Sequence, residues 1–353
     1  MKKITVIGKG LAGSLAIKHF EKYYEVECLY TNDYIQNVGI SSALDLYFTI
    51  NDFTYEDIKA FNGNHKTGVH KLNFNKDYFQ SFIPPFVSVQ FNSKEFVDFI
   101  NNNSNALFKQ VDSIDYNSID TDYIINCSGV SELTDDYYKL KYIPVNAVIS
   151  TKIKEEYIDD FTTISAQDYG WTSKIPTLNG TFVAYIFNKD INTKEEILSA
   201  FPYDVNEYQY FEFNNYYHKK PFSENIFYNG NKAFFIEPFE GTSLSGIVKT
   251  NSTILDIIEN QISIEESTKH YNNYFKECQD VILMHYLSTN KNTAFWDNAN
   301  KLAEQHFINN GSSVITDVLN NKQVQSFFYD NTLYQYNIDN LGIRNKLKDL
   351  LFW

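Results

Sequence analysis

The chain has 353 residues, 43% hydrophobic and 21% charged, which is ordinary for a globular protein and long enough for one large or two interleaved domains. Its net charge of −14 and its lack of a basic cluster argue against nucleic acid as a partner, because binding phosphates needs gathered Lys and Arg. Three scattered cysteines indicate neither a disulfide framework nor a metal site, and no run reaches the roughly twenty apolar residues of a membrane span, so we expect a cytoplasmic protein without membrane contact.

The first thirty residues predict a strand, a glycine turn, a helix and a second strand. Residues 3–7 form a short apolar run, and the motif Gly8-Lys9-Gly10-Leu11-Ala12-Gly13 follows it directly. Residues 15, 16 and 20 then recur at helical spacing, and YEVECLYT (24–31) is the next strand. In this context the glycines allow a pyrophosphate to approach the helix N-terminus, where backbone N–H groups attract anions. The alternative is a tight turn that binds no nucleotide.

The end of the second strand lacks the acidic residue that binds ribose in many dinucleotide folds. Thr31 holds that place, and Asp33 follows two residues later. An NAD-dependent dehydrogenase is therefore disfavoured.

The remaining chain predicts mixed strands followed by helices. SKEFVDFINNN (93–103) is typical of a helix, and DYIINCSG (122–129) of a strand that ends in small residues. From residue 142 to residue 188 the pattern is mainly β. After residue 250 it becomes helical, with apolar residues at spacings of three and four: Tyr271, Phe275, Cys278, Ile282 and Tyr286.

Three further stretches carry a family resemblance. DYGWTSKIP (168–176) keeps Gly170, Trp171, Ile175 and Pro176 of the pattern G-W-x-W-x-I-P, with Ser173 at the second tryptophan. The stretches FNGNHKTGVHKLNF (61–74) and FYNGNKAFFIEPFEGTS (227–243) are similar to two more segments of the same family. The chain thus resembles a flavin-dependent halogenase of the tryptophan-halogenase-like family. The match spans nearly the whole chain, which is shorter than typical members.

This resemblance implies an α/β fold of the two-dinucleotide-binding FAD flavoprotein type, with an interleaved mixed β-sheet substrate region and a helical C-terminal portion. The expected domains are 1–250 for FAD, with the β-rich region at about 46–95 and 140–222, and 251–353 for the helices.

The resemblance also implies roles for individual residues. Lys66 and Glu240 match the catalytic pair, and Thr242 and Ser243 the halide-binding amides, with Ser243 in place of a family glycine and Gly241 in place of a serine. Phe82 and Phe86 would contact the substrate, and Trp171, Ile175 and Pro176 would shield the flavin. The implied FAD-binding residues are Gly8, Gly10, Leu11, Ala12, Gly13, Ser41, Gly129, Gly230 and Leu244.

The implied reaction begins with reduced FAD, which a separate flavin reductase supplies and which reacts with dioxygen to give a flavin hydroperoxide. A halide ion attacks the distal oxygen, and the resulting hypohalous acid reaches a small, electron-rich, indole-like aromatic substrate. Lys66 would polarise the oxidant or form a haloamine, while Glu240 would orient it or accept the substrate proton. The resemblance leaves a homodimer, the preferred halide and the exact substrate open.

Two other functions fit the same residues. Ser173 in place of tryptophan leaves open an aromatic monooxygenase of the same fold, although Lys66 with Glu240 argues against it. The altered loop at Ile40-Ser41-Ser42 is compatible with a non-catalytic flavin-binding protein. Outside these motifs, we expect Cys127 to be a buried filler and His218-Lys219-Lys220 to be a solvated charge cluster.

Overall fold

The structure is a computed structural model that describes residues 2–31, 44–45, 53–66, 69–81, 88–129, 132–154, 161–178, 180–203, 205, 207–327 and 330–352. The chain divides into two compact units, each assembled from separate segments. Unit 1 comprises Met1–His65, Ser88–Lys139 and Tyr216–Asn272, and unit 2 comprises Lys66–Val87, Leu140–Asn215 and Asn273–Trp353. The functional domain boundaries inferred from the sequence stay a prediction.

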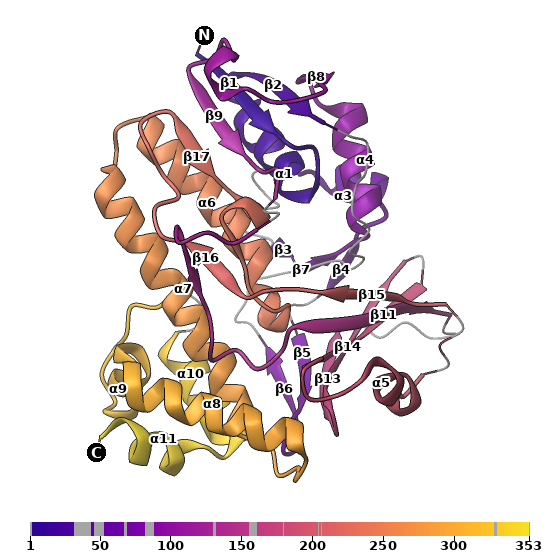
Figure 1. Cartoon of the computed structure of the whole chain (residues 1–353), viewed down its shortest axis with the longest axis vertical. Helices are drawn as coiled ribbons and strands as arrows, with labels where there is room; N and C mark the ends of the chain where they lie inside the picture. Colours follow the sequence, from indigo (N-terminus) through magenta and orange to yellow (C-terminus); the bar gives the residue numbers. More distant parts are fainter. Residues whose placement is uncertain are drawn as a thin grey trace. The chain divides into compact units, whose positions relative to one another are not determined.

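Unit 1 is built on a parallel sheet. Its strands are ordered β17-β9-β1-β2-β8, and each neighbouring pair is parallel. Figure 1 shows β1, β2, β8 and β9 of this sheet in indigo to purple and β17 in salmon, and the central strands are apolar because both of their faces are covered. The strands are β1 (Lys3–Ile7), β2 (Glu25–Tyr30), β8 (Leu107–Gln110), β9 (Tyr123–Asn126) and β17 (Ile226–Tyr228).

The helices and smaller sheets of unit 1 follow from local signals. Helix α4 (Ser93–Asn103) begins where the Asn92 side chain accepts hydrogen bonds from the amides of Lys94 and Glu95. The other helical elements are α1 (Leu11–Phe20), α3 (Tyr55–Ala60), α6 (Thr242–Ile258) and the 3-10 turns η1 (Tyr116–Ser118), η2 (Gly230–Lys232) and η3 (Phe239–Gly241). Two three-stranded sheets join β3 (Leu44–Asp45), β7 (Ser88–Gln90) and β4 (Asn64–Lys66), and β10 (Tyr137–Lys139), β16 (Tyr216–His218) and β18 (Phe234–Phe235).

Unit 2 contains a seven-stranded mixed sheet ordered β15-β11-β14-β13-β12-β5-β6, in which only the β12–β5 pair is parallel among the described pairings. Alternate residues of β11 and β14 form a fully buried core with Ile197 of helix α5, whose capping box at Thr193 sets its start. The elements are β5 (Val69–Asn73), β6 (Asp77–Ser81), β11 (Ala147–Ile153), β12 (Thr162–Gln167), β13 (Gly170–Thr177), β14 (Gly180–Phe187), α5 (Lys194–Ala200) and β15 (Gln209–Glu212).

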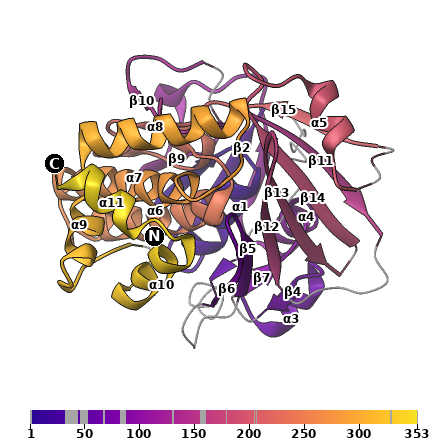
Figure 2. The same cartoon turned by 90° about the horizontal axis from the view of Figure 1, so that it is seen from below.

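The helical part of the chain confirms the predicted periodicity. Helix α7 (Ile264–Tyr286) contains the boundary between the two units, and the five apolar residues that predicted it are all buried. Figure 2 shows the C-terminal helices gathered beside it. They are α8 (Ala294–Asn310), α9 (Ser313–Leu319), α10 (Asn331–Leu341) and α11 (Arg344–Leu351). Within the described residues, no helix combines the length and apolar character needed to cross a membrane.

Candidate functional site

The glycine motif forms a tight turn between β1 and α1 in unit 1. Gly8 has a φ of 94°, and a Cβ there would lie 2.9 Å from the carbonyl oxygen of Cys127. A Cβ on Gly13 would lie 1.8 Å from the Gly8 oxygen. At Gly10, the N-cap of α1, a Cβ would meet no described atom within 4 Å. Gly8 and Gly13 therefore allow the backbone to close on itself, and Gly10 leaves space among the described atoms, as a cradle for a phosphate requires.

This turn lies at the point where the strand order of the sheet reverses. From β1 the chain first builds outward to β2 and β8, and then returns to β9 and β17 on the other side. Because all these strands are parallel, their carboxyl ends share one edge. Gly8, Gly129 and Gly230 all follow such carboxyl ends. Ligands of open α/β sheets bind at this kind of switch point.

The segment after β9 is held by a carboxamide that the sequence analysis did not single out. Asn126 is buried, and its Nδ2 donates to the Tyr116 hydroxyl at 2.7 Å. Its Oδ1 accepts from the Ser128 amide at 3.0 Å and from the Ser128 hydroxyl at 2.7 Å. The turn ends at Gly129, with φ of 82° and no described atom within 4 Å of a Cβ position. Cys127 is half-buried rather than buried as predicted, but desolvation raises the pKa of its thiol, which argues against a nucleophile.

Gly230 packs directly against the start of α1. Its φ is 54°, and a Cβ would lie 2.3 Å from the Cβ of Ala12. The preceding Asn229 is fully buried and ties this turn to α6, since its Nδ2 donates to the Ile247 carbonyl at 3.0 Å and to Asn251 Oδ1 at 2.8 Å. The structure thus brings together three predicted contributors, namely Gly230, Ala12 and α6. The sequence gives no signal for this role of Asn229 other than its position next to Gly230.

The loop before α6 leaves the first amides of this helix without a side-chain cap among the described residues. Gly241 is the N-cap and has a left-handed φ of 64°, which explains a glycine where the family has serine. The Ser243 hydroxyl donates instead to the Ile236 carbonyl at 3.1 Å, and the buried Thr242 hydroxyl lies 3.5 Å from the carbonyl of Glu237. Leu244 is also buried. Uncapped N–H groups at a helix start favour an anion.

The tryptophan motif lies on β13 in unit 2. Trp171 is fully buried, and its indole N–H donates to the Tyr286 hydroxyl at 2.9 Å. Because side chains alternate along a strand, Trp171, Ser173 and Ile175 share one face and Pro176 lies on the other. The structure therefore places Trp171 in a packed aromatic cluster with Tyr286, whose ring centroid is 5.8 Å from that of Trp296.

Several predicted residues lie outside the described part of the chain. Ser41, Phe82 and Phe86 belong to this group. Lys66 is described only as the last backbone position of β4, and Glu240 only as the middle of η3; their side chains are outside the described atoms. The pairing of Lys66 with Glu240 stays a prediction.

One structural finding corrects the sequence analysis. His218 is not part of a solvated charge cluster: its ring is buried between Tyr137 and Tyr228, at centroid distances of 4.8 and 4.9 Å. Its Nδ1 accepts from the Lys220 amide at 3.0 Å, and burial lowers the pKa of His218. The adjacent lysines misled the prediction because nothing nearby in sequence identifies the two tyrosines that cover the ring.

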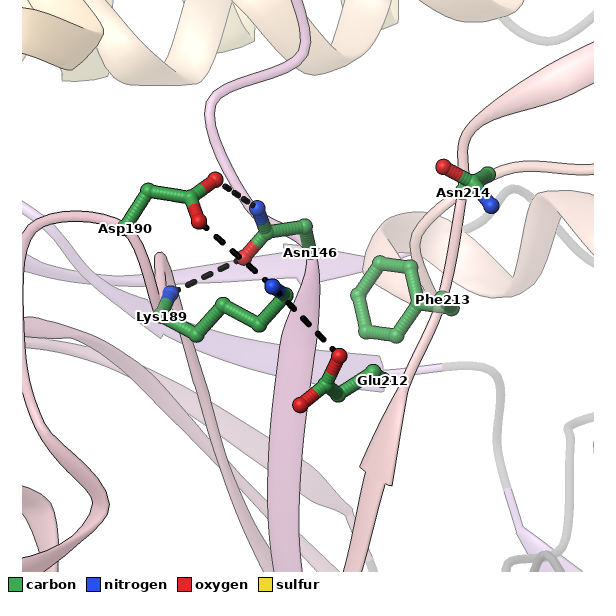
Figure 3. A pocket seen from close by; sticks show the side chains of 6 residues that line it. All are labelled: Asn146, Lys189, Asp190, Glu212, Phe213 and Asn214. Carbon is green, nitrogen blue, oxygen red and sulfur yellow. Dashed lines mark hydrogen bonds and ion pairs between the residues drawn. The ribbon is translucent and has the colours of Figure 1, made fainter.

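A cavity of about 310 Å³ in unit 2 is separate from all of these residues (Figure 3). Lys189 Nζ lies between Asp190 Oδ1 at 3.5 Å and Glu212 Oε2 at 3.4 Å, and Asp190 also accepts from Asn146 at 2.7 Å. Asp190, with Glu212, raises the pKa of Lys189, so its amine stays a cation. These polar groups pair with one another and provide no nucleophile. In the described residues, no group of His, Cys, Asp and Glu could hold a metal ion.

The parallel sheet with its glycine cradle, together with the mixed sheet of unit 2, defines an α/β protein of the two-dinucleotide-binding flavoprotein class. The sequence profile of the tryptophan halogenase family matches residues 72–348. The chain belongs to this family, as a shortened member, and is an oxidoreductase of the flavin-dependent halogenase kind. No protein of curated function matches the chain at a significant level.

Solved structures agree with this fold. A tryptophan halogenase from Shewanella frigidimarina superposes with a TM-score of 0.82 at 13% identity, covering 99% of this chain and 93% of the other. A flavin-dependent halogenase from Xanthomonas campestris gives a TM-score of 0.77 at 14% identity, covering 99% and 95%. A tryptophan 6-halogenase from Streptomyces toxytricini gives 0.77 at 12% identity, covering 99% and 96%. At these identities the likeness establishes the fold.

Proposed function

We propose that this protein is an FADH2-dependent halogenase that acts on a small, electron-rich, indole-like aromatic compound. The observation that supports this most directly is the cradle formed by Gly8, Gly13 and Gly230 at the switch point of the parallel sheet. In each of these glycines a Cβ would collide with protein, whereas at Gly10 and Gly129 it would have no described atom within 4 Å. These residues fit a dinucleotide.

Bound reduced FAD would activate dioxygen and so supply the oxidising power that converts a halide ion to hypohalous acid. The first amides of α6, from Ser243 onward, would hold the halide, because they begin a helix that no described side chain caps. The hydroxyls of Ser243 and Thr242 donate to backbone carbonyl groups, so these side chains do not act as the cap of α6. A separate flavin reductase would supply the reduced cofactor, and a homodimer stays a prediction.

Lys66 and Glu240 are the proposed catalytic pair. The Lys66 amine would hydrogen-bond and polarise the hypohalous acid or be halogenated itself, and Glu240 would orient the oxidant or accept the proton that leaves the aromatic ring. Phe82 and Phe86 would contact the substrate.

The experiment is a substrate-and-halide screen with purified protein, FAD, a flavin reductase and mass detection of products. We expect halogenated product from wild-type protein, and a loss of at least about a hundredfold in Lys66→Ala and Glu240→Gln with FAD binding unchanged. Matched controls are Lys59→Ala and Glu224→Gln, which change exposed residues of unit 1. A Lys66→Ala variant that binds FAD normally and keeps full activity would contradict the assignment.

The same screen separates a second candidate, an aromatic monooxygenase. Ser173 favours this candidate because it occupies the place of a shielding tryptophan, on the same face of β13 as Trp171. Hydroxylated products that need no halide would establish it. FAD binding without any product across a broad panel would instead favour a non-catalytic flavin-binding protein.

A further inference from the structure

Three tyrosine hydroxyls donate to three consecutive carbonyl groups next to Gly230. Tyr216 donates to the Asn231 oxygen at 2.7 Å, and Tyr137 to the Lys232 oxygen at 2.9 Å. Tyr271 donates to the Ala233 oxygen at 3.1 Å. The tyrosines come from β16, β10 and α7, so three separate elements of unit 1 converge on one short turn. We call Tyr137, Tyr216 and Tyr271 the tyrosine clamp.

The three tyrosines of the clamp are buried, and their hydroxyl groups stay protonated. All three rings are buried, with exposed fractions of 6 to 8%. The rings of Tyr137 and Tyr216 contact each other edge to face, with centroids 5.4 Å apart. Burial raises the pKa of Tyr137 to about 12 and raises the pKa values of Tyr216 and Tyr271 as well. The three phenols therefore stay protonated donors throughout the physiological range.

The clamp acts on a turn that is held from its other end as well. Asn229 Oδ1 accepts from the Gly230 amide at 2.6 Å, while the same carboxamide binds α6. Gly230 in turn contacts Ala12 of the glycine motif closely enough to exclude a Cβ. The carbonyls of a helical turn point in one direction and its amides in the other. Fixing the carbonyls of residues 231–233 consequently fixes the turn's amide end and the place of Gly230 beside α1.

We propose that Tyr137, Tyr216 and Tyr271 are positioning residues that hold the Gly230 turn ready for flavin before the cofactor binds. The inference rests on the proposed function and adds three residues that none of the family motifs contains. A turn that is already ordered binds its ligand more tightly, because no part of the binding free energy is lost in ordering the turn.

The test uses the full chain with Tyr137→Phe, Tyr216→Phe and Tyr271→Phe, which keep the rings and remove the hydroxyls. FAD affinity is measured by flavin fluorescence, and hydrogen exchange of residues 229–233 is measured without FAD. We expect FAD binding about two- to tenfold weaker in each variant, the range that corresponds to one net hydrogen bond, and faster exchange in the turn. Tyr336→Phe is the matched control, because its hydroxyl donates to the Phe79 carbonyl in unit 2 at 2.9 Å. Both readouts should stay at wild-type values there.

Phe variants that lower thermal stability but keep wild-type FAD affinity would overturn the proposal, since the hydroxyls would then be merely structural. Weaker FAD binding with unchanged exchange in the turn would overturn it too. If the Tyr271→Phe variant fails to fold, FAD affinity and hydrogen exchange of the Tyr137→Phe and Tyr216→Phe variants test the proposal. A wild-type protein that does not bind FAD would instead overturn the proposed function itself, and the two failures are therefore distinguishable.

Discussion

Gly230 combines two requirements that only glycine meets. Its backbone adopts a left-handed conformation with φ of 54°, and its missing Cβ leaves room for Ala12. A substitution there meets conformational strain and a steric clash together. Gly311, the residue after α8, has a similar φ of 64° but no described atom within 4 Å of a Cβ position. This pair of glycines allows the two costs to be separated.

We expect Gly230→Ala to weaken FAD binding by at least about tenfold, because the turn must move away from α1 to accommodate the methyl group. Gly311→Ala should lose about 1 to 3 kcal/mol of unfolding free energy from backbone strain alone, because φ of 64° with ψ of −173° is a conformation that almost only glycine adopts, and it should keep normal FAD affinity. Fluorescence titration and thermal unfolding of both variants provide the measurement. Equal FAD affinity in the two variants would show that close packing at Gly230 is unimportant for the cofactor.

Ser243 stands where the family has glycine, and its hydroxyl donates to the Ile236 carbonyl. We therefore predict that Ser243→Ala leaves the halide concentration for half-maximal activity within about twofold of wild type. The variant should lose about 1 kcal/mol of stability, the usual contribution of one hydrogen bond. Steady-state halide titrations measure the half-maximal halide concentration, and denaturant unfolding measures the loss of stability. A large gain in activity on removing the hydroxyl would mean that Ser243 obstructs the halide.

At the scale of elements, the sequence predicted those whose signals are local. The strand, glycine turn and helix at β1 and α1 appear as expected, and α4 coincides with the predicted range 93–103. Helix α7 was predicted from its apolar spacing, which depends on residues within two turns of each other. These features need no knowledge of what lies elsewhere in the fold.

Other elements could not be predicted because they depend on distant partners. The parallel pairing of β12 with β5 joins Thr162 to His70, more than ninety positions away. The sheet β10-β16-β18, which carries two members of the tyrosine clamp, also joins distant segments. Helix α5 was not predicted for a different reason. It is a short helix inside a β-rich stretch, and its clearest sequence signal is the capping box formed by Thr193 and Glu196.

Helix α7 also carries a buried histidine that should make stability depend on pH. His285 is fully buried, its Nδ1–H donates to the Val281 carbonyl at 2.8 Å, and desolvation lowers its pKa to about 4. The folded state therefore resists protonation, whereas the unfolded chain takes up a proton near pH 6.5. The stabilising effect is complete above pH 6.5 and is lost as the pH falls toward 4. From this shift we expect a loss of about 3 kcal/mol across that range.

The measurement is denaturant unfolding of wild type and His285→Asn between pH 7 and pH 4. Asparagine keeps a donor near the Nδ1 position but does not titrate, so the variant should lose about 3 kcal/mol less than wild type over this range. His270→Asn, an exposed change on the same helix, is the control and should follow the wild-type curve. Parallel curves for wild type and His285→Asn would contradict the prediction.

At the scale of the molecule, the predicted groups divide between the two units. Unit 1 holds the described residues that we propose for nucleotide and halide binding, and unit 2 holds Trp171 and the position of Lys66. The glycine turn between β1 and α1 was predictable because its strand, its glycines and its helix start depend only on residues that are close in the sequence. Asn126, Asn229 and the tyrosine clamp were not predictable, because asparagine and tyrosine are frequent in this chain and only the fold shows which of them are buried against the site.

This division predicts where FAD should stabilise the chain. Since the described residues that we propose for FAD binding belong to unit 1, FAD at a hundred times its Kd should raise the free energy of opening unit 1 by about 2.7 kcal/mol. Hydrogen exchange would then slow by about a hundredfold in β1, β9 and α6, and by less in β11 and β14 of unit 2. NADH at the same concentration should protect neither unit, since Thr31 stands at the expected place of the ribose-binding acid. Protection by NADH, or protection confined to β11 and β14, would show that the glycine cradle of unit 1 is not the flavin site.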